Sequence, residues 1–346
     1  MKKCLTIILV CILALSVLTA CGDKSSSGQN STNDMPTNIL PANDPPVNNL
    51  PSNNSPAAGN SPVNDPPVNN TPTASPSTQT PAASPANSFY TGRLISVVTR
   101  EEGSGTRDAV RDLFNIKGAD GKENVTPEAI VTDSTGVMII TIVGDPYAIG
   151  YCSLASLNDS VKALSIDGVA ATVENVKNGS YKIQRPFYLA TLGEANGLAK
   201  DFIDFILSKE GQEAATRRCI PVVENAPPYS GSRPSGRIVV GGSSSVSPVM
   251  DDLITAYKAI NPNAEIELQV SDSSKGMADA KSGAYDIGMA SRALKDAELA
   301  DGLIPVRIAI DGIAVIVNAN NPITALTVEQ VRNIYNGEIE TWKSVQ

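Results

Sequence analysis

A strand-like segment, a loop rich in serine and glycine, and the start of a helix follow one another four times in this chain. The loops occupy 100–107, 241–247, 271–276 and 291–292. Strands that alternate with helices are typical of an α/β fold. In open α/β sheets, ligands bind beyond the carboxyl ends of the strands. We therefore expect the four loops to lie together and to form a binding site.

The first loop reads Arg-Glu-Glu-Gly-Ser-Gly-Thr-Arg, between an apolar run at 94–98 and a helix-like run at 108–114. A helix N-terminus presents unpaired N–H groups and the positive end of the helix dipole, which suits an anion. Two small hydroxyls and Arg100 surround this point. The alternative is an ordinary turn that uses glycine and serine for geometry alone. The spacing of a nucleotide P-loop is absent.

Taken together, the loops carry many hydroxyls and N–H groups and few charges. Such a set suits a dehydrated tetrahedral oxyanion, which needs short donors from all sides. Serines also cap helices, and capping alone would explain one loop of this kind. Four loops with clustered hydroxyls favour the anion-binding interpretation.

The N-terminus predicts export. Lys2 and Lys3 precede an apolar stretch at 5–18, which is typical of a signal peptide over 1–20. The sequence Leu-Thr-Ala-Cys at 18–21 looks like a bacterial lipobox and implies a lipid on the thiol of Cys21. A plain signal peptide with a chance cysteine is the alternative. We expect an extracytoplasmic protein anchored to the cell membrane by its lipid.

Residues 21–88 are expected to be a disordered linker. Pro, Asn, Ser and Thr dominate the segment, and the seven residues at 43–49 recur at 64–70. Such a composition cannot bury enough apolar surface to fold. The remaining residues, 89–346, are predicted to form the binding domain, as one large domain or two lobes.

Composition excludes several functions. The net charge is −9 with no basic block, and aromatic residues make up only 4%, which argues against nucleic acid as a partner. The chain has no histidine, so Ser-His-Asp triads and histidine metal sites are excluded. No metal-ligand spacing occurs, and we expect no metal and no cofactor. Cys152 and Cys219 are expected to be buried and unpaired.

The chain resembles the phosphate-binding proteins of bacterial phosphate ABC importers (PstS-like proteins). The motifs that carry the resemblance lie at 99–109, 148–151, 241–248, 286–292 and 311–318. The resemblance extends over nearly all of 93–346. It implies a two-lobed fold similar to the type II periplasmic binding proteins, with the ligand between the lobes.

The order of the motifs differs from that of the family. Residues from about 93 to 222 resemble its second half, and residues from about 236 to 346 resemble its first half. A Pro/Gly/Ser bridge at 225–236 joins them. The resemblance therefore implies a circular permutant, and a truncated tandem duplication is the alternative.

Carried onto this chain, the family fold implies two discontinuous lobes. Lobe A is expected to combine about 93–183 with about 310–346, and lobe B to take about 184–309. Arg185 and Asp311 then lie near the two crossings between lobes.

The resemblance implies a role for individual residues. Arg100 corresponds to the single arginine that gives phosphate a charge-assisted bond. Further contacts to phosphate are implied from the hydroxyl and N–H groups of Ser104, Gly105, Thr106, Ser244, Ser245, Ser273 and Ser291.

Position 291 bears on selectivity. Some members of the family carry an aspartate there, which accepts the proton of hydrogen phosphate and excludes sulfate. In this chain Asp272 and Glu102 are the nearby carboxylates that could accept that proton. Arg292 is either a second positive group or a solvated surface arginine.

The resulting prediction is a lipoprotein that captures inorganic phosphate and delivers it to the permease of an ABC importer, without catalysis. Alternatives are a binding protein for sulfate or molybdate, a phosphate sensor or adhesion module, and a phosphoester hydrolase. The absence of histidine argues against the hydrolase.

Overall fold

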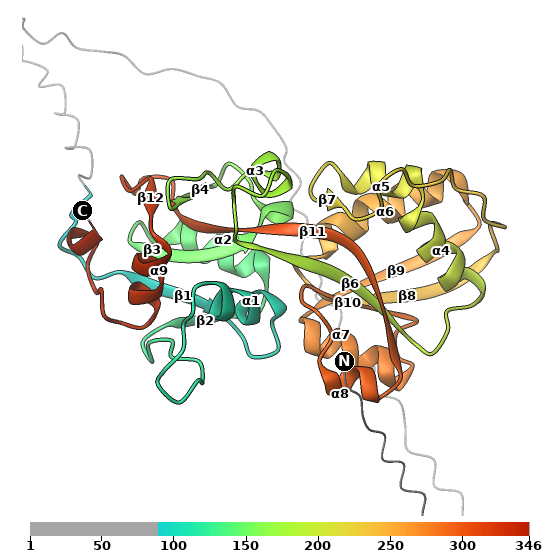
Figure 1. Ribbon diagram of the computed structural model, residues 1–346, viewed down its shortest axis with the longest axis horizontal. Coiled ribbons are helices and arrows are strands. Elements are labelled where there is room, and N and C mark those ends of the chain that lie inside the picture. Colours follow the sequence, from blue (N-terminus) through green and yellow to red (C-terminus); the bar gives the residue numbers. More distant parts are fainter. Residues whose placement is uncertain (1–88, 346) are drawn as a thin grey trace, which may run out of the picture. The chain divides into compact units, whose positions relative to one another are not determined.

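The computed structural model describes residues 89–345, so the predicted signal peptide, Cys21 and the whole predicted linker lie outside the described residues. Figure 1 shows the arrangement of the elements. The elements up to the first crossing between the two halves of the sheet are β1 (Ser96–Arg100), α1 (Gly105–Leu113), β2 (Ile130–Thr132), α2 (Thr135–Gly144), β3 (Ala148–Ser153), the 3-10 turn η1 (Leu154–Ser156), β4 (Val161–Ala163), β5 (Ser165–Ile166), α3 (Val173–Lys177) and β6 (Gln184–Leu192).

The elements after that crossing are α4 (Gly197–Leu207), α5 (Lys209–Ala215), β7 (Ile220–Pro221), β8 (Gly236–Ser243), α6 (Ser247–Ile260), β9 (Ala264–Ser271), α7 (Ser273–Ser282), β10 (Ile287–Ala290), α8 (Asp296–Ala300), β11 (Leu303–Asn318), β12 (Ala325–Leu326), α9 (Val328–Tyr335) and η2 (Trp342–Val345).

One mixed sheet runs through the described part of the chain, in the order β2-β1-β3-β11-β6-β10-β8-β9. The short strands β4 and β7 also pair with β11, and β12 pairs with β5 in a separate sheet. Strands β1, β2 and β3 are parallel to one another, as are β8, β9 and β10. The chain is therefore an α/β protein, as its alternating pattern predicted.

The long strand β11 joins the two halves of this sheet. Its residues from Leu303 to Gly312 pair with β6, and those from Ile313 to Val317 pair with β3. Figure 1 shows β11 and β6 running side by side between the two groups of helices. Two neighbouring antiparallel strands thus make the passage from one half to the other.

Two large hydrophobic cores lie on either side of this passage. Members of the first come from Val97 to Ile183 and from Ile313 to Trp342. Members of the second come from Phe187 to Ala309, together with Ala155. We call the parts built around these cores lobe A and lobe B. Continuous apolar runs in β3, β10 and the second half of β11 are buried on both faces, as parallel or central strands require.

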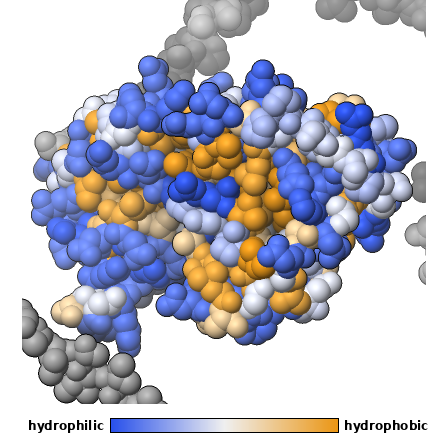
Figure 2. Space-filling view, turned by 45° about the vertical axis from the view of Figure 1, so that its right-hand side comes forward, coloured by the Kyte–Doolittle hydropathy of each residue, from blue (hydrophilic) through white to orange (hydrophobic). Residues whose placement is uncertain are grey.

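Helix α2 is apolar on all sides. It packs Met138, Ile139 and Ile142 into the core of lobe A, and it exposes Val137 and Ile140. Hydrophobic surface is likewise interspersed with hydrophilic surface on the face shown in Figure 2. Helix α2 contains no charged residue and therefore forms no ion pairs. Its buried side chains and the capping bond at Ser134 hold it against lobe A.

Carboxylates fix the starts of two short helices in lobe B. Helix α7 begins at Ser273, because the carboxylate of Asp272 accepts a bond from Lys275 N at 2.9 Å and caps the helix. Helix α8 begins at Asp296. There the Glu298 carboxylate accepts a bond from Lys295 N at 2.7 Å and fixes the first turn.

Candidate functional site

The carboxyl ends of the strands in both lobes meet at one place. Lobe A contributes the residues that follow β1 and β2, and lobe B contributes those at the ends of β8, β9 and β10. Their hydroxyl side chains are each at most 6% exposed. We call these residues the hydroxyl cluster: Thr106, Thr135, Ser243, Ser244, Ser245, Ser273 and Ser291.

The loop before α1 fits against lobe B because it contains glycine. Ser104 caps the helix by accepting a bond from Arg107 N at 3.3 Å. A Cβ atom on Gly105 would lie 2.6 Å from Ser273 Oγ and 2.8 Å from Ser291 Oγ. Glycine thus allows the backbone of α1 to touch two hydroxyls of the opposite lobe.

Hydroxyls of the two lobes bond directly to one another. Thr106 Oγ1 lies 2.8 Å from Ser245 Oγ, and Thr135 Oγ1 lies 3.1 Å from the same oxygen. Thr135 N also donates to Ser244 Oγ at 3.2 Å. A group placed between the lobes can therefore take bonds from both.

Thr135 is a site residue that the sequence analysis missed. It is the first residue of α2, after the cap residue Ser134, which accepts a bond from Val137 N at 3.2 Å. The sequence held the signal, because 130–132 is a β-branched run and 133–136 is a polar loop with two hydroxyls and a glycine. This is a fifth unit of strand, hydroxyl loop and helix.

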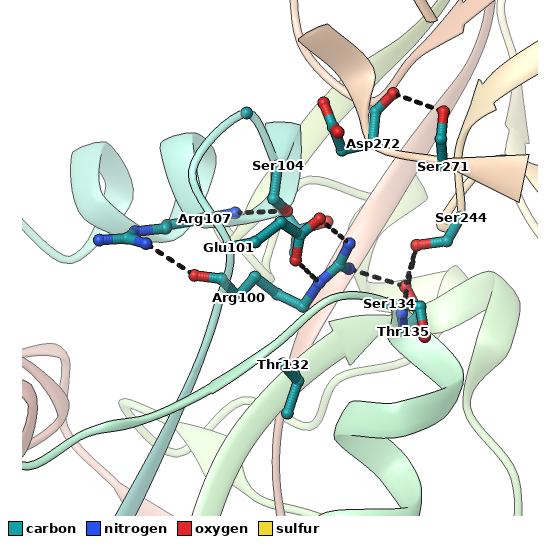
Figure 3. Close-up of polar contacts among 12 residues, drawn as sticks. Arg100, Glu101, Ser104, Arg107, Thr132, Ser134, Thr135, Ser244, Ser271 and Asp272 are labelled. Atoms are coloured by element: carbon teal, nitrogen blue, oxygen red, sulfur yellow. Dashed lines mark hydrogen bonds and ion pairs between the residues drawn. The ribbon is translucent and has the colours of Figure 1, made fainter. Parts of the chain in front are cut away.

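Arg100 lies at the end of β1 with its side chain 3% exposed. Its guanidinium donates through Nε and Nη2 to the two carboxylate oxygens of Glu101, both at 2.7 Å. Nη1 donates to Thr135 Oγ1 at 3.1 Å. Figure 3 shows the guanidinium between Glu101 and Thr135, with Ser244 on the far side of Thr135. The Arg100 guanidinium is therefore buried, and its Nη1 group is directed at the hydroxyl cluster.

On the lobe B side, two serines and an arginine form a network around Ser291. Arg185 Nη1 donates to Ser291 Oγ at 3.2 Å, and Ser243 Oγ donates to the same oxygen at 2.9 Å. Ser291 N donates to Ser273 Oγ at 3.1 Å. Arg185 entered the sequence analysis only as a crossing residue, because its position in an otherwise apolar strand gave no sign of contact with Ser291.

The carboxylates differ from those expected. Glu102 is exposed and makes no hydrogen bond to the hydroxyl cluster, which disfavours it as the acceptor of the phosphate proton. The chain turns after Arg100, and that turn brings Glu101 onto the guanidinium instead. Asp272 borders the first loop, since a Cβ atom on Gly103 would lie 2.7 Å from Asp272 Oδ1, but this oxygen already caps α7.

Arg292 is not a solvated surface arginine. It is 8% exposed, and its guanidinium pairs with Glu298 at 2.7 Å and with Asp108 at 3.5 Å. Two carboxylates offset its charge, so Arg292 ties α8 and α1 together at the rim of the site.

Cys152 and Cys219 are buried and unpaired, which confirms the prediction for these thiols. Burial raises the pKa of the Cys152 thiol to about 12, so it stays protonated and unreactive near neutral pH. Among residues 89–345, no group of three or more His, Cys, Asp or Glu side chains is placed to hold a metal ion.

The chemistry of this site is hydrogen-bond donation. Hydroxyls, the N–H groups at the starts of α1, α2 and α7, and the buried Arg100 and Arg185 converge between the lobes. Helix N-termini and charge-assisted bonds favour an anion. The arrangement suits a small oxyanion that accepts bonds on every side.

Comparison with known proteins identifies the family. The family model of the PBP superfamily domain matches residues 89–210 and 227–346. The phosphate-binding protein PstS 2 of Streptococcus agalactiae serotype V is 46% identical over 256 residues, which are 72% of this chain and 87% of that protein. The chain belongs to the PstS family of the PBP superfamily.

A solved structure agrees with this membership. The crystal structure of a phosphate-binding protein of a phosphate ABC transporter from Streptococcus pneumoniae TIGR4 matches with a TM-score of 0.58 and 38% identity. The match covers 73% of this chain and all of that one. The predicted family and the two-lobed α/β fold of periplasmic binding proteins are thereby confirmed.

A third relative in the PstS family aligns over a shorter stretch. The phosphate-binding protein PstS of Bacillus subtilis is 39% identical over 121 residues, which are 35% of this chain and 38% of that protein. The Streptococcus agalactiae relative thus aligns over 72% of this chain, whereas the Bacillus subtilis relative aligns over 35% of it.

Proposed function

We propose that this chain captures inorganic phosphate between its two lobes and delivers it to the permease of an ABC importer, without covalent chemistry. The observation that carries the proposal is the hydroxyl cluster, in which donors from both lobes converge beside the buried Arg100. The PstS 2 relative from Streptococcus agalactiae, a phosphate-binding protein by name, supports phosphate as the anion.

In this proposal, phosphate takes its bonds from donors that the two lobes now share. Arg100 gives charge-assisted bonds, and the loop of α1 gives the N–H groups and hydroxyls of Ser104, Gly105 and Thr106. Lobe B gives the hydroxyls or N–H groups of Ser244, Ser245, Ser273 and Ser291. Thr135 joins them from α2, since it bonds Arg100, Ser244 and Ser245.

Opening and closing of the lobes would accompany capture. Among residues 89–345, two neighbouring strands, β6 and β11, carry the sheet from one lobe to the other. Hinge motion about such crossings is a common way for binding proteins to enclose a ligand. Loss of the bonds between Thr106, Thr135 and Ser245 opens the site, and an anion bound by both lobes closes it.

We further propose that the chain is a circular permutant. The lobe A core joins residues before Ile183 with residues after Ile313, so each lobe is complete within one chain. A rearranged order also explains why the Bacillus subtilis relative aligns over only 121 residues. A truncated tandem duplication, which would need a second chain, is disfavoured by the two complete cores.

The proposed location is the outer face of the cell membrane, with a lipid on Cys21 as the anchor and residues 22–88 as the tether. Within residues 89–345, no helix combines the length and apolarity needed to cross a bilayer. A firm lipid anchor at the N-terminus would keep the binding domain near the permease.

A crystal structure of the purified chain with phosphate tests this proposal. The anion is expected between the lobes, in contact with Arg100, Thr106 and Ser245. An anion bound elsewhere, or release of phosphate from a chromogenic phosphoester at a rate that depends on the cluster, would contradict it. Displacement of phosphate by sulfate or molybdate at equal concentration would assign the site to another oxyanion.

A further inference from the structure

Arg185 and Asp311 form a buried ion pair where the two lobes meet. They lie opposite each other in the antiparallel register of β6 and β11. The guanidinium donates through Nε and Nη2 to Asp311 Oδ2, both at 3.3 Å, and the two side chains are 2% and 0% exposed. Burial of two charges is costly unless they are paired and fully bonded, so their geometry is strongly constrained.

The surroundings fix the plane of the guanidinium. Asp311 Oδ1 accepts bonds from Ser153 Oγ at 2.8 Å and from Ala155 N at 3.4 Å, which hold the carboxylate from lobe A. The Arg185 guanidinium lies over the Phe187 ring, 5.4 Å from its centroid. With one edge of the fork bound to Asp311, the remaining group Nη1 is directed at Ser291 Oγ, 3.2 Å away.

This bond decides what the Ser291 hydroxyl can do. A hydroxyl oxygen accepts two hydrogen bonds and donates one. Ser291 Oγ accepts from Arg185 Nη1 and from Ser243 Oγ, so both acceptor positions are taken. Its own proton is left to donate, because the contact with Ser273 Oγ is long, at 3.4 Å, and that oxygen already accepts from Ser291 N at 3.1 Å.

We infer that Arg185 is a positioning residue of the anion site, which makes Ser291 an obligate hydrogen-bond donor toward the ligand. The inference rests on the proposed function. An oxyanion offers acceptor oxygens, so a fixed donor at this position strengthens binding whether or not the ligand carries a proton. Selection for the proton of phosphate then falls to a carboxylate elsewhere in the site.

A double-mutant cycle tests the inference in the full-length mature chain, with calorimetric titration of phosphate as the readout. Arg185→Lys keeps a positive charge opposite Asp311. Its compact ammonium lacks the planar guanidinium that bonds Asp311 and Ser291 at the same time. We expect about tenfold weaker phosphate binding from Arg185→Lys in the wild-type background. In the Ser291→Ala background, Arg185→Lys should change the affinity for phosphate by less than about twofold, because the bond between Arg185 and Ser291 is already absent.

Two results would overturn the inference. One is an unchanged affinity in Arg185→Lys, and the other is the same loss in both backgrounds, which would mean that Arg185 acts through charge or fold alone. Arg218→Lys is the matched control, because Arg218 also pairs with an aspartate, Asp252 at 2.7 Å, and makes no bond to the cluster. It should leave the affinity unchanged.

A second variant covers the case in which Arg185→Lys does not fold. Replacing both partners, as Arg185→Met with Asp311→Leu, removes the guanidinium without leaving a buried charge. We expect the same loss of phosphate affinity in this double variant, and no such loss when Ser291 is also replaced by alanine.

If the wild type binds sulfate instead of phosphate, the proposed function fails, but the cycle run with sulfate still decides the role of Arg185. Wild-type protein that binds neither anion would overturn both.

Discussion

Arg100 and Glu101, neighbours in the chain, face each other through two bonds of 2.7 Å between the guanidinium and the carboxylate. The carboxylate takes the Nε–Nη2 edge of the guanidinium, one of the two edges through which an arginine can bind an oxyanion. Glu101 is therefore both a competitor for Arg100 and the carboxylate closest to its charge. A bound anion must displace it or share the guanidinium with it.

Glu101→Gln should tighten the binding of both phosphate and sulfate, and that of sulfate by more. The change removes a competing negative charge, and a carboxylate that faces a fully deprotonated anion repels it. Competition titration of the two anions measures the effect. Glu102→Gln is the control, because this side chain is exposed and should change neither affinity. Weaker binding of both anions in Glu101→Gln would refute the competitor role.

Arg100→Ala should weaken phosphate binding by about 1.5–3 kcal/mol, because it removes a charge-assisted bond from a buried ligand. Ser244→Ala should cost about 1 kcal/mol, the typical value for a neutral bond. Arg111→Ala, on α1 but paired with Asp108 at 2.8 Å and away from the cluster, is the control. If both site variants bind phosphate with the affinity of the wild type, Arg100 and Ser244 do not contact the ligand.

Gly105→Ala should weaken phosphate binding by about 1–3 kcal/mol, the usual cost of an overpacked contact. The new methyl group on lobe A would meet Ser273 Oγ and Ser291 Oγ of lobe B and would hold the two lobes apart. Gly136→Ala on α2 is the matched control, since nothing lies within 4 Å of its added Cβ. If both variants bind phosphate as the wild type does, the lobes do not close on the loop of α1.

The pH dependence of stability should report on Asp311. Burial raises its pKa from the ordinary 3.8 to about 6. The folded chain then holds this proton more tightly than the unfolded chain does. The stabilisation from Asp311 is complete below about pH 4 and is lost as the pH rises through about 6.

Urea unfolding across this interval measures the effect. The wild type should lose unfolding free energy between about pH 4 and 6, relative to the variant with Arg185→Met and Asp311→Leu, which lacks the group. Parallel pH profiles in the two proteins would show that Asp311 keeps its ordinary pKa.

The sequence was a good guide where function depends on local pattern. The loops at Ser104, Ser244 and Ser273 were predictable, because each follows a strand and begins a helix, and that order alone places them at one edge of a sheet. Thr135 also follows a strand and begins a helix, so the same pattern could have identified it as a site residue.

Other features depend on tertiary structure. Glu101 and Glu102 are equivalent by composition, and only the turn after β1 decides which of them meets Arg100. The contact between Arg185 and Ser291 joins residues 106 positions apart, and it exists because β6 and β10 are neighbours in the sheet. No local signal could reveal it.

The central claim, that phosphate is bound between the lobes, is tested most directly by calorimetric titration of the purified chain with phosphate and, separately, with sulfate. The account predicts saturable binding of one phosphate per chain and much weaker binding of sulfate. Absence of saturable binding of phosphate, or sulfate binding of equal strength, would contradict it.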